Sequence, residues 1–326
     1  MSFEGLHAQL APRLKQVEGR ILEALHTDVS LLDATNRSLL ERPGKMMRPM
    51  LSLLMADVLG GGGEDCIRGA ACLELLHNAS LLHDDVVDGA RDRRGRPTVA
   101  SLLSGGAAVL IGDFWMVRAL PLLLEMEQNR DRKLRICSDV LSQLAEGELL
   151  QMQKASSGDT SEADYLRIIH CKTGSLFEAS ALLGALSTPA SEEQIRCAGH
   201  FGRQLGRVFQ MRDDIFDYLD SPAGIGKPVG IDLKEQKITL PLLCVLEKAT
   251  PQEEKDIRSR MIHVADEPQL AAGIRDFVLS RGGIDLAEAR IERELQAALG
   301  YTEDFPASAA REALQELARL AAQRKQ

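Results

Sequence analysis

The chain has 326 residues, of which 44% are hydrophobic and 27% are charged, so it can bury a large core and is not disordered. A formal net charge of −9 without a basic block argues against nucleic-acid partners, which need dense positive charge against their phosphates. Aromatic residues are scarce, and none occurs between Phe3 and Phe114. Because sheets are enriched in aromatic and β-branched residues, this scarcity favours an α-rich fold.

Apolar residues recur with the 3.6-residue period of helices along the whole chain. We expect helices over 5–25, 46–59, 65–90, 97–104, 106–126, 131–153, 161–187, 191–219, 234–248, 251–262, 267–281, 283–298 and 306–324. Loops are expected at 60–63, at 154–161 and at 220–232, which is rich in proline and glycine. Ser161, with Asp164 three residues later, is expected to cap a helix. No segment alternates with period 2, so residues 1–326 are expected to form a single all-α domain.

Three features of the sequence concern its compartment. The N-terminal segment lacks the apolar core of a signal peptide, and no apolar run approaches the length of about 18 residues that a transmembrane helix needs. The six cysteines include no CxxC pair, which favours reduced, buried thiols over disulfides or zinc. We therefore expect a cytoplasmic protein without a transmembrane segment. Residues 250–326 are expected to serve helix packing and to end in a loosely held tail.

One acidic pattern occurs twice: DDVVD spans Asp84 to Asp88, and DDIFD spans Asp213 to Asp217. On a helix, residues i and i+4 lie on one face about 6 Å apart, so the outer carboxylates of each motif point the same way. Clustered carboxylates among apolar residues repel one another and lose solvation, and a hard divalent cation relieves both costs. Mg²⁺ prefers a few carboxylates together with waters and substrate phosphates. The pair of motifs therefore predicts a magnesium site, whereas one motif alone is also compatible with a solvated acidic face.

Cationic residues accompany both motifs. Arginine pairs with phosphate oxygens through a planar fork, and lysine acts as a point charge. The candidates are Lys45, Arg48, Arg93, Arg94, Lys172 with the adjacent Thr173, Lys227 and Lys237. Each of them alone is compatible with an ordinary surface charge. Together with two acidic motifs they predict a cavity that holds more than one diphosphate.

These motifs resemble those of the trans-prenyltransferases of the polyprenyl diphosphate synthase family, over about residues 40–245. The resemblance rests on GKMMRP, LLHDDVVDGARDRRG, AEGELLQ, KTGSLFEAS, FQMRDDIFDY, GKPVGIDL and EQKITLPLL, in the order that the family has them. The segment AEGELLQ is similar to a helix typical of long-chain members. Two positions depart from the family pattern, because Gln236 replaces a glycine and Arg212 directly precedes the second acidic motif.

The resemblance implies an all-α helical bundle around a deep central cavity, usually in a homodimer. It implies Mg²⁺ as the cofactor, with isopentenyl diphosphate and an allylic diphosphate as substrates. The implied Mg²⁺ ligands are Asp84 and Asp88 with Asp85 in support, and Asp213 with Asp214 and Asp217 close by. The residues implied to hold the allylic diphosphate are Arg93, Lys172, Thr173, Gln210, Lys227 and Lys237, of which Lys172, Thr173 and Gln210 are the catalytic candidates. The residues implied to hold isopentenyl diphosphate are Lys45, Arg48, His77 and Arg94.

His77 lies seven residues before Asp84, two helical turns along the same face, so the spacing permits a shared site. The alternative is a structural helical histidine. The resemblance also implies a mechanism. The diphosphate of the allylic substrate departs with the help of Mg²⁺ and cationic side chains, the alkene of isopentenyl diphosphate attacks the resulting allylic cation, and a proton is then lost.

Product length is expected to depend on the helix that leads to Asp84. Ala79 and Ser80 lie five and four residues before Asp84, and both are small. In the family, aromatic residues at these positions accompany short products and small residues accompany long ones. We therefore expect a product of C30 or longer, such as a quinone side-chain precursor delivered to a membrane. Alternatively, the two residues are small for close helix packing.

Several other functions share some of these sequence features. A shorter-chain synthase with C15 or C20 products differs only in the cavity. A class I terpene synthase is disfavoured because its second motif usually differs and its pocket is rich in aromatic residues. A regulatory subunit of a heteromeric synthase would be indicated by decay of an acidic motif, and both motifs are intact. A plain helical scaffold leaves the twin motifs without a purpose.

Overall fold

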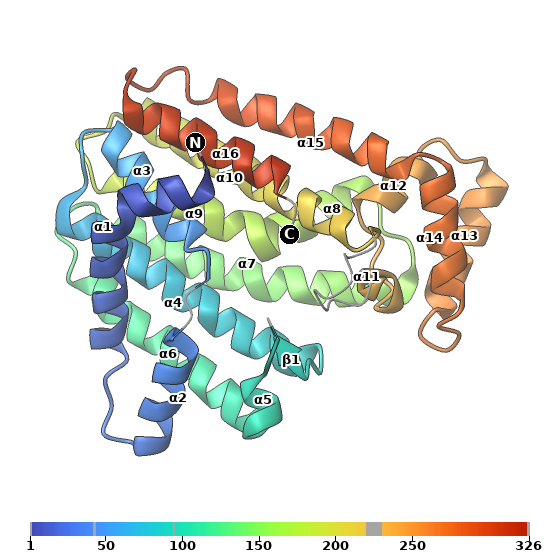
Figure 1. Cartoon of the computed structure of the whole chain (residues 1–326), viewed down its shortest axis with the longest axis horizontal. Coiled ribbons are helices and arrows are strands. Elements are labelled where there is room, and N and C mark those ends of the chain that lie inside the picture. Colours follow the sequence, from blue (N-terminus) through green and yellow to red (C-terminus); the bar gives the residue numbers. More distant parts are fainter. Residues whose placement is uncertain (1, 42–43, 94, 220–229, 325–326) are drawn as a thin grey trace. The chain divides into compact units, whose positions relative to one another are not determined.

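The structure is a computed structural model that describes residues 2–41, 44–93, 95–219 and 230–324. Helices form nearly all of its regular structure, which confirms the all-α prediction (Figure 1). The chain divides into two compact units. Unit 1 comprises Met1–Leu141, Leu176–Gly202 and Tyr301–Leu317, and unit 2 comprises Ser142–Ser175, Arg203–Gly300 and Ala318–Gln326. The single domain expected for residues 1–326 and its deep central cavity stay predictions.

Unit 1 carries the N-terminal helices and a short hairpin. Its elements are α1 (Phe3–Ala24), α2 (Ser30–Leu40), α3 (Met47–Val58), α4 (Gly63–Val87), β1 (Asp92–Arg93), β2 (Arg96–Pro97), α5 (Val99–Leu102) and α6 (Gly105–Leu124), with the first part of α7 (Arg130–Ser157), nearly all of α9 (Ser175–Leu186), the first part of α10 (Glu192–Phe216) and most of α16 (Ala309–Gln323). The strands pair antiparallel, with Asp92 opposite Pro97. The sequence shows no alternating pattern for this hairpin, because each strand has only two residues.

The core of unit 1 is built around α3 and α4, which are buried on nearly all sides, as expected of helices that are apolar all round. Helix α4 packs against α1, α3 and α6. A Cβ atom on Gly112 of α6 would lie 3.2 Å from the carbonyl oxygen of Ala79 and would clash with the His83 ring. The close approach of α6 to the end of α4 that leads into the first acidic motif therefore depends on this glycine.

Unit 2 carries the helices from the middle of the chain onward. Its own elements are α8 (Glu162–Ile169), the π-helix η1 (His170–Gly174), α11 (Ile231–Lys234), α12 (Leu240–Leu246), α13 (Pro251–His263), α14 (Leu270–Ser280) and α15 (Gly283–Gly300). Helix α12 is wholly buried and packs against α14 and α15. Helix α8 begins with Ser161 and Asp164 in a reciprocal capping box, which confirms the predicted helix start.

Some predicted boundaries in unit 2 are wrong. Helix α7 continues to Ser157 into the loop expected at 154–161, whereas the helix expected over 161–187 extends from Glu162 to Leu186 with the π-helical turn η1 inside it. Residues 231 and 232 of the loop expected at 220–232 belong to α11, and residues 220–229 lie outside the described residues.

The helix expected over 234–248 begins only at Leu240. Gln236 adopts φ 58°, in the left-handed region that favours glycine, and this conformation breaks the helical path before residue 240.

The cysteine prediction is confirmed, since all six cysteines are free and buried. One helix qualifies the prediction that no apolar run approaches the length of a transmembrane helix. Among the described residues, α6 alone is long and apolar enough to cross a membrane by length and composition, with a mean hydropathy of 1.7. Asp113 and Arg118 interrupt its apolar sequence, and a core helix of a soluble protein can meet the same criteria.

Candidate active site

The first acidic motif lies at the C-terminal end of α4, where Asp88 is the C-cap residue. Asp84 is half-buried and Asp88 is exposed. The carboxylate of Asp85 is buried and accepts a 2.7 Å hydrogen bond from Nε of Arg93 on β1. This ion pair fixes the hairpin to the end of α4, so Asp85 supports the motif from inside while the two outer carboxylates remain accessible.

The cations predicted in unit 1 lie on different elements. Lys45 is exposed beside the ring of Phe3, at 6.0 Å from its centroid. The guanidinium of Arg48, at the start of α3, lies 4.9 Å from the centroid of the Phe177 ring. His77 lies on α4, and its carbonyl oxygen accepts a 2.8 Å hydrogen bond from the Ser80 hydroxyl. Arg94 lies outside the described residues.

The second acidic motif, in unit 2, is joined to two predicted catalytic residues by a directed chain of hydrogen bonds. The Thr173 hydroxyl donates to Oε1 of Gln210 at 2.8 Å, and Nε2 of Gln210 donates to Oδ1 of Asp214 at 3.0 Å. On the other carboxylate oxygen, Asp214 accepts a 2.6 Å hydrogen bond from the phenol of Tyr165. Three predicted site residues are thereby brought together, and Tyr165, which the sequence analysis missed, completes the chain.

Burial dominates the electrostatics of Asp214. It raises the pKa of this carboxyl group, and the hydrogen bonds from Gln210 and Tyr165 act in the opposite direction. Burial, followed by the charge of Asp214, raises the pKa of the Tyr165 phenol well above its ordinary value. The phenol therefore stays protonated and serves as a donor.

The π-helix η1 holds Lys172 and Thr173 on consecutive positions, and π-helical turns are frequent at functional sites. Helix α7 approaches η1 closely, because a Cβ atom on Gly147 would lie 2.6 Å from Cβ of Cys171. The next residue, Glu148, forms a salt bridge with the Lys172 ammonium group. Glu148 belongs to the segment AEGELLQ, so the sequence carried a signal for this residue without revealing its partner.

Asp217 follows α10 directly and accepts backbone N–H bonds from Ile231 at 2.9 Å and from Asp232 at 3.1 Å. It therefore secures the first turn of α11. Burial, followed by the charges of Asp214 and Asp217, raises the pKa of Asp232 to about 8. Asp232 is a fourth carboxyl group, beside Asp213, Asp214 and Asp217 of the motif. The sequence analysis did not single it out, although it stands in the quoted block GKPVGIDL.

Two further predicted cations and one departure from the family pattern belong to unit 2. Lys237 pairs with Glu235 at 2.5 Å, and Lys227 lies outside the described residues. Arg212, which directly precedes the second motif, forms a bidentate ion pair with Glu288 of α15. The charge of Arg212 is thus largely neutralised from outside the motif.

The carboxyl groups fit a divalent cation. Asp214, Asp217 and Asp232 combine at least partial burial with mutual repulsion, which raises the pKa of Asp214 and of Asp232, and hard oxygen donors of this kind suit Mg²⁺ or Ca²⁺. In the first motif, Asp84 and Asp88 offer the same donors.

The two residues expected to set product length differ in their surroundings. Ala79 is fully buried, and its carbonyl oxygen faces Gly112 of α6 at the close helix contact. Ser80 is nearly buried, one helical turn before Asp84 on the same side of α4. The packing alternative therefore applies to Ala79, and Ser80 is the better candidate for the wall. Two open surface pockets in unit 1 contain no predicted site residue.

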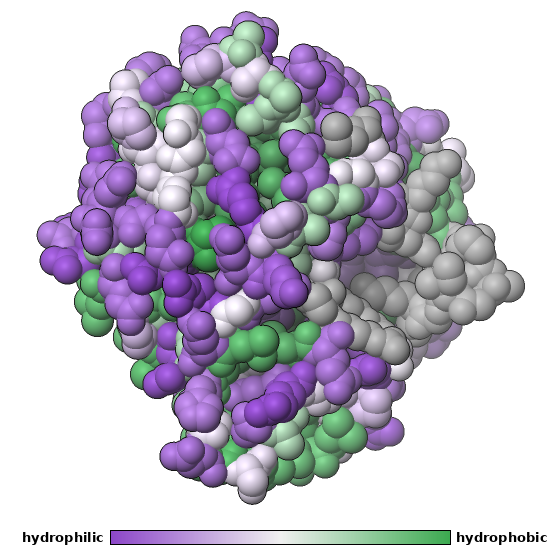
Figure 2. Space-filling view, turned by 60° about the vertical axis from the view of Figure 1, so that its left-hand side comes forward, coloured by the Kyte–Doolittle hydropathy of each residue, from purple (hydrophilic) through white to green (hydrophobic). Residues whose placement is uncertain are grey.

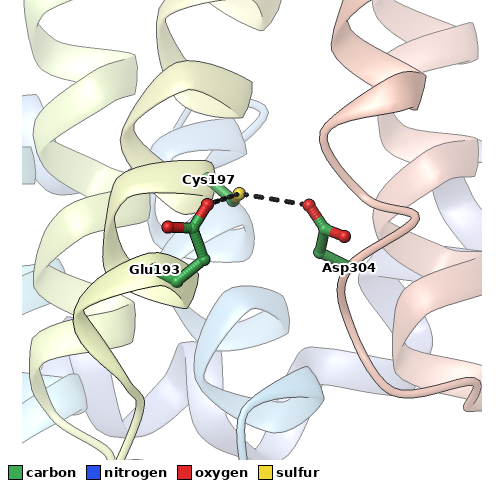
Figure 3. A group of neighbouring side chains, drawn as sticks. All are labelled: Glu193, Cys197 and Asp304. Atoms are coloured by element: carbon green, nitrogen blue, oxygen red, sulfur yellow. Dashed lines mark hydrogen bonds between the residues drawn. The ribbon is translucent and has the colours of Figure 1, made fainter.

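A group of possible metal ligands lies outside both motifs, in unit 1 (Figure 3). Cys197 of α10 lies with its sulfur 3.8 Å from Oε1 of Glu193 and 3.5 Å from Oδ2 of Asp304. Burial, followed by the bond to Asp304, raises the pKa of the Cys197 thiol. The thiol therefore stays protonated and donates to the carboxylates, as the prediction of reduced, buried thiols requires.

Comparison with known proteins places the chain in a family. The family model of polyprenyl synthetases matches residues 29–272. The chain is 34% identical to the octaprenyl diphosphate synthase of Escherichia coli over 99% of both chains. It is 38% identical to the all-trans-nonaprenyl-diphosphate synthase (geranyl-diphosphate specific) of Rhodobacter capsulatus, over 97% of this chain and 96% of that protein.

Among solved structures, the chain is similar to a polyprenyl synthase from Caulobacter crescentus in complex with calcium and isoprenyl diphosphate. The TM-score is 0.91 and the identity 32%, over 100% of this chain and 98% of that one. These matches confirm the predicted family, fold and enzyme class. The chain belongs to the polyprenyl synthetase family, whose members are divalent-metal-dependent prenyltransferases that act on isoprenoid diphosphates.

Proposed function

We propose that this protein condenses isopentenyl diphosphate with an allylic diphosphate primer, farnesyl or geranylgeranyl diphosphate, to give a long-chain all-trans polyprenyl diphosphate. The observation that carries the proposal is the directed hydrogen-bond chain from Thr173 through Gln210 to Asp214. It links a catalytic pair to a carboxylate of the second acidic motif. A structural scaffold has no need for such a chain between a π-helix and a motif of metal-ligand type.

The proposed cofactor is Mg²⁺. Asp84 and Asp88 would hold it at the first motif, and Asp213, Asp214 and Asp217 would hold it at the second. When bound, Mg²⁺ neutralises diphosphate charge and so makes the diphosphate a better leaving group. The relative from Caulobacter crescentus was solved with calcium and isoprenyl diphosphate, which supports a divalent cation and a diphosphate as ligands of this fold.

The allylic diphosphate is proposed to lie against Arg93, Lys172, Thr173, Gln210, Lys227 and Lys237. Lys172 supplies positive charge, and Glu148 holds its ammonium group in place. The hydroxyl of Thr173 donates its proton to Gln210, and it would have to turn from Gln210 to donate to a phosphate oxygen instead. As the carbon–oxygen bond of the allylic diphosphate breaks, negative charge grows on the departing diphosphate, and preorganised cations and dipoles stabilise it.

Isopentenyl diphosphate is proposed to bind Lys45, Arg48, His77 and Arg94. Its double bond attacks the allylic cation to form the new carbon–carbon bond, and the resulting cation loses a proton to the released diphosphate. Holding both substrates in place supplies much of the rate, because a positioned pair reacts as one molecule. The Phe177 ring, over which the guanidinium of Arg48 lies, restricts the motion of this cation and so helps to position the substrate.

A product of C30 or longer is proposed because Ser80 is small on the Asp84 side of α4, so no aromatic ring blocks the growing chain there. The names of the octaprenyl and nonaprenyl relatives support a long chain. Such a product suits the side chain of a quinone, made in the cytoplasm and delivered to a membrane. A C15–C20 synthase or a subunit of a heteromeric synthase is the alternative.

We propose a homodimer with α6 in its interface. Leu110, Val117, Leu120 and Leu124 recur along one face of α6 and are between 41% and 70% exposed. In Figure 2, hydrophobic surface appears among polar residues in the lower part of the molecule, where α2, α5 and α6 lie in Figure 1.

The double variant Leu110→Lys with Val117→Lys should be monomeric by light scattering, and Leu22→Lys on α1 should remain dimeric. An unchanged dimer in the double variant would remove α6 from the interface.

The function is tested through the hydrogen-bond chain. Thr173→Val keeps the shape of the side chain but removes its hydroxyl, and we expect prenyl transfer to slow by about 10- to 100-fold. Thr35→Val, on the exposed α2, is the matched control and should act at the wild-type rate. Thermal unfolding of both variants checks that the fold is kept. Wild-type turnover by Thr173→Val would contradict the proposed role of the chain.

A further inference from the structure

The end of α16 places an arginine in the second acidic motif. The guanidinium of Arg324 forms an ion pair with Asp213, the first carboxylate of DDIFD. It also lies over two aromatic rings of α10, at 4.0 Å from the centroid of Phe209 and 5.4 Å from that of Phe216. Ala321 and Ala322 are buried as well. The prediction of a loosely held tail is therefore wrong for residues 321–324.

This arginine is held at a cost. Its side chain is only 15% exposed, and among the described residues its Nε atom has no hydrogen-bond partner. Burial, followed by the charge of Arg212, lowers the pKa of Arg324 to about 10. A buried cation that loses its anionic partner is strongly destabilised. The position of Arg324 therefore depends on Asp213 remaining available as its counter-ion.

We propose that Arg324 is a resident cation of the second acidic motif: it neutralises Asp213 in the metal-free enzyme, and it leaves this carboxylate when a divalent cation binds there. The inference rests on the proposed metal role of Asp213. A guanidinium and a divalent cation on the same carboxylate repel each other, so the presence of one weakens the binding of the other. Metal binding and docking of the C-terminal segment, by which we mean residues 321–324 at the end of α16, thus compete for the carboxylate of Asp213.

Competition of this kind is reciprocal. Arg324 lowers the affinity of the motif for metal, and bound metal lowers the equilibrium constant for docking of Arg324 by the same factor. In the docked state the guanidinium lies over the rings of Phe209 and Phe216, so its departure also uncovers these rings. The C-terminal segment therefore reports, from within unit 2, whether the second motif carries metal.

The first test measures Mn²⁺ binding to the full chain without substrate, by electron paramagnetic resonance of free Mn²⁺ at fixed ionic strength. Arg324→Gln should bind Mn²⁺ about tenfold more tightly than wild type, within the usual range of such couplings. Arg324→Lys keeps the charge and should return most of the affinity toward the wild-type value. Arg311→Gln, whose guanidinium donates to the carbonyl of Phe305, removes the same charge elsewhere and should behave as wild type.

A double-mutant cycle assigns the effect to the ion pair. In an Asp213→Asn background, Arg324→Gln should leave the remaining Mn²⁺ affinity unchanged. Wild-type or weaker affinity in Arg324→Gln alone would overturn the proposal. If Asp213→Asn binds Mn²⁺ as well as wild type does, Asp213 is no ligand and the proposal falls. Prenyl transfer by the same wild-type preparation then shows separately whether the proposed function stands.

A second readout follows the segment itself. Trypsin must accommodate the Arg324 side chain to cut the bond after it, and the docked side chain is withheld from the protease. Mn²⁺ should accelerate this cleavage in wild type, as followed by intact mass, whereas Asp213→Asn should be cut quickly with or without Mn²⁺. A wild-type cleavage rate that does not respond to Mn²⁺ would contradict release of the segment.

Discussion

The phenol of Tyr165 lies 2.6 Å from Oδ2 of Asp214 and donates a hydrogen bond to this buried carboxylate. Gln210 occupies the other oxygen, so each oxygen of Asp214 has one side-chain donor. The carboxylate is thereby fixed in rotation, and any metal or substrate must meet it in one orientation. Outer partners of this kind orient the groups that they bind.

Removal of the phenol tests this relationship. Tyr165→Phe should lower metal affinity or prenyl transfer by about 10- to 100-fold, because one oxygen of Asp214 loses its donor. Stability should fall by about 1–3 kcal/mol for the same reason. Steady-state kinetics across Mg²⁺ concentrations and urea unfolding measure the two effects. Tyr301→Phe, whose ring stacks on His200 in unit 1, is the matched control. Equal kinetics in both variants would show that Asp214 needs no such support.

The buried carboxyl groups predict a pH dependence of stability in the absence of metal. Burial raises the pKa of Asp214, and burial with neighbouring carboxylates raises that of Asp232 to about 8. In the unfolded chain both groups lose their protons near pH 4, at the ordinary value of about 3.9. Above that pH the folded state binds more protons than the unfolded state, so the free energy of unfolding falls as pH rises toward 8, by up to about 1.4 kcal/mol per pH unit and group.

Urea unfolding in EDTA between pH 5 and pH 8 measures this slope. Asp232→Asn removes one of the two groups, so its stability should fall less steeply than that of wild type. Metal affinity should increase over the same interval, because the carboxyl groups must lose their protons to bind a cation. A variant slope as steep as the wild-type slope would show that Asp232 is ionised in the folded protein throughout.

Product length should respond to Ser80 and Ala79 in different ways. Ser80→Phe places a ring on the Asp84 side of α4, and we expect its main product to be several isoprene units shorter, with a smaller loss of stability than in Ala79→Phe because Ala79 is the more deeply buried of the two. Ala79→Phe forces a ring into the contact of α4 with α6, and overpacking of this kind costs about 1–3 kcal/mol. Mass spectrometry of the products and thermal unfolding separate the two outcomes. Long products from a folded Ser80→Phe would remove Ser80 from the cavity wall.

Gln236 offers a stabilising substitution. A non-glycine residue in the left-handed region costs about 1–2 kcal/mol, and Gln236 adopts φ 58°. Glycine also has more freedom in the unfolded chain, and the bond from Gln236 to the carbonyl of Ile262 would be lost. We therefore expect Gln236→Gly to raise the free energy of unfolding by at most about 0.5 kcal/mol, because the extra chain entropy and the lost hydrogen bond offset most of the relieved strain. The control Gln236→Ala keeps the strain without the hydrogen bond and should be less stable than wild type in urea.

Helical periodicity was sufficient to predict the fold class, and the second acidic motif supplied Asp214. Thr173 and Gln210 were implied as catalytic candidates only by the resemblance to the family. The interruption at His170–Gly174 could not be predicted, because a π-helical turn has no periodicity signal of its own. The partners of site residues were also hidden. Tyr165 and Asp214 are 49 positions apart, and only the packing of unit 2 joins them.

The C-terminal segment shows a different limit of sequence reasoning. Its composition, AAQRKQ, is typical of a solvated tail, and nothing local indicates that Arg324 has an anionic partner. The contact arises because α16 ends beside α10, more than a hundred positions away in the chain. By contrast, the missing glycine at position 236 was visible in the sequence, and the structure supplied its physical meaning as a positive φ angle.

The most direct measurement is the mass of the product formed by the purified protein from isopentenyl diphosphate and farnesyl diphosphate, with Mg²⁺ and with EDTA. We expect polyprenyl diphosphates of C30 or longer with Mg²⁺, and no elongation in EDTA. Products that end at C15 or C20 would contradict the long-chain assignment. The absence of any elongation by a folded protein with Mg²⁺ would contradict the proposed activity itself.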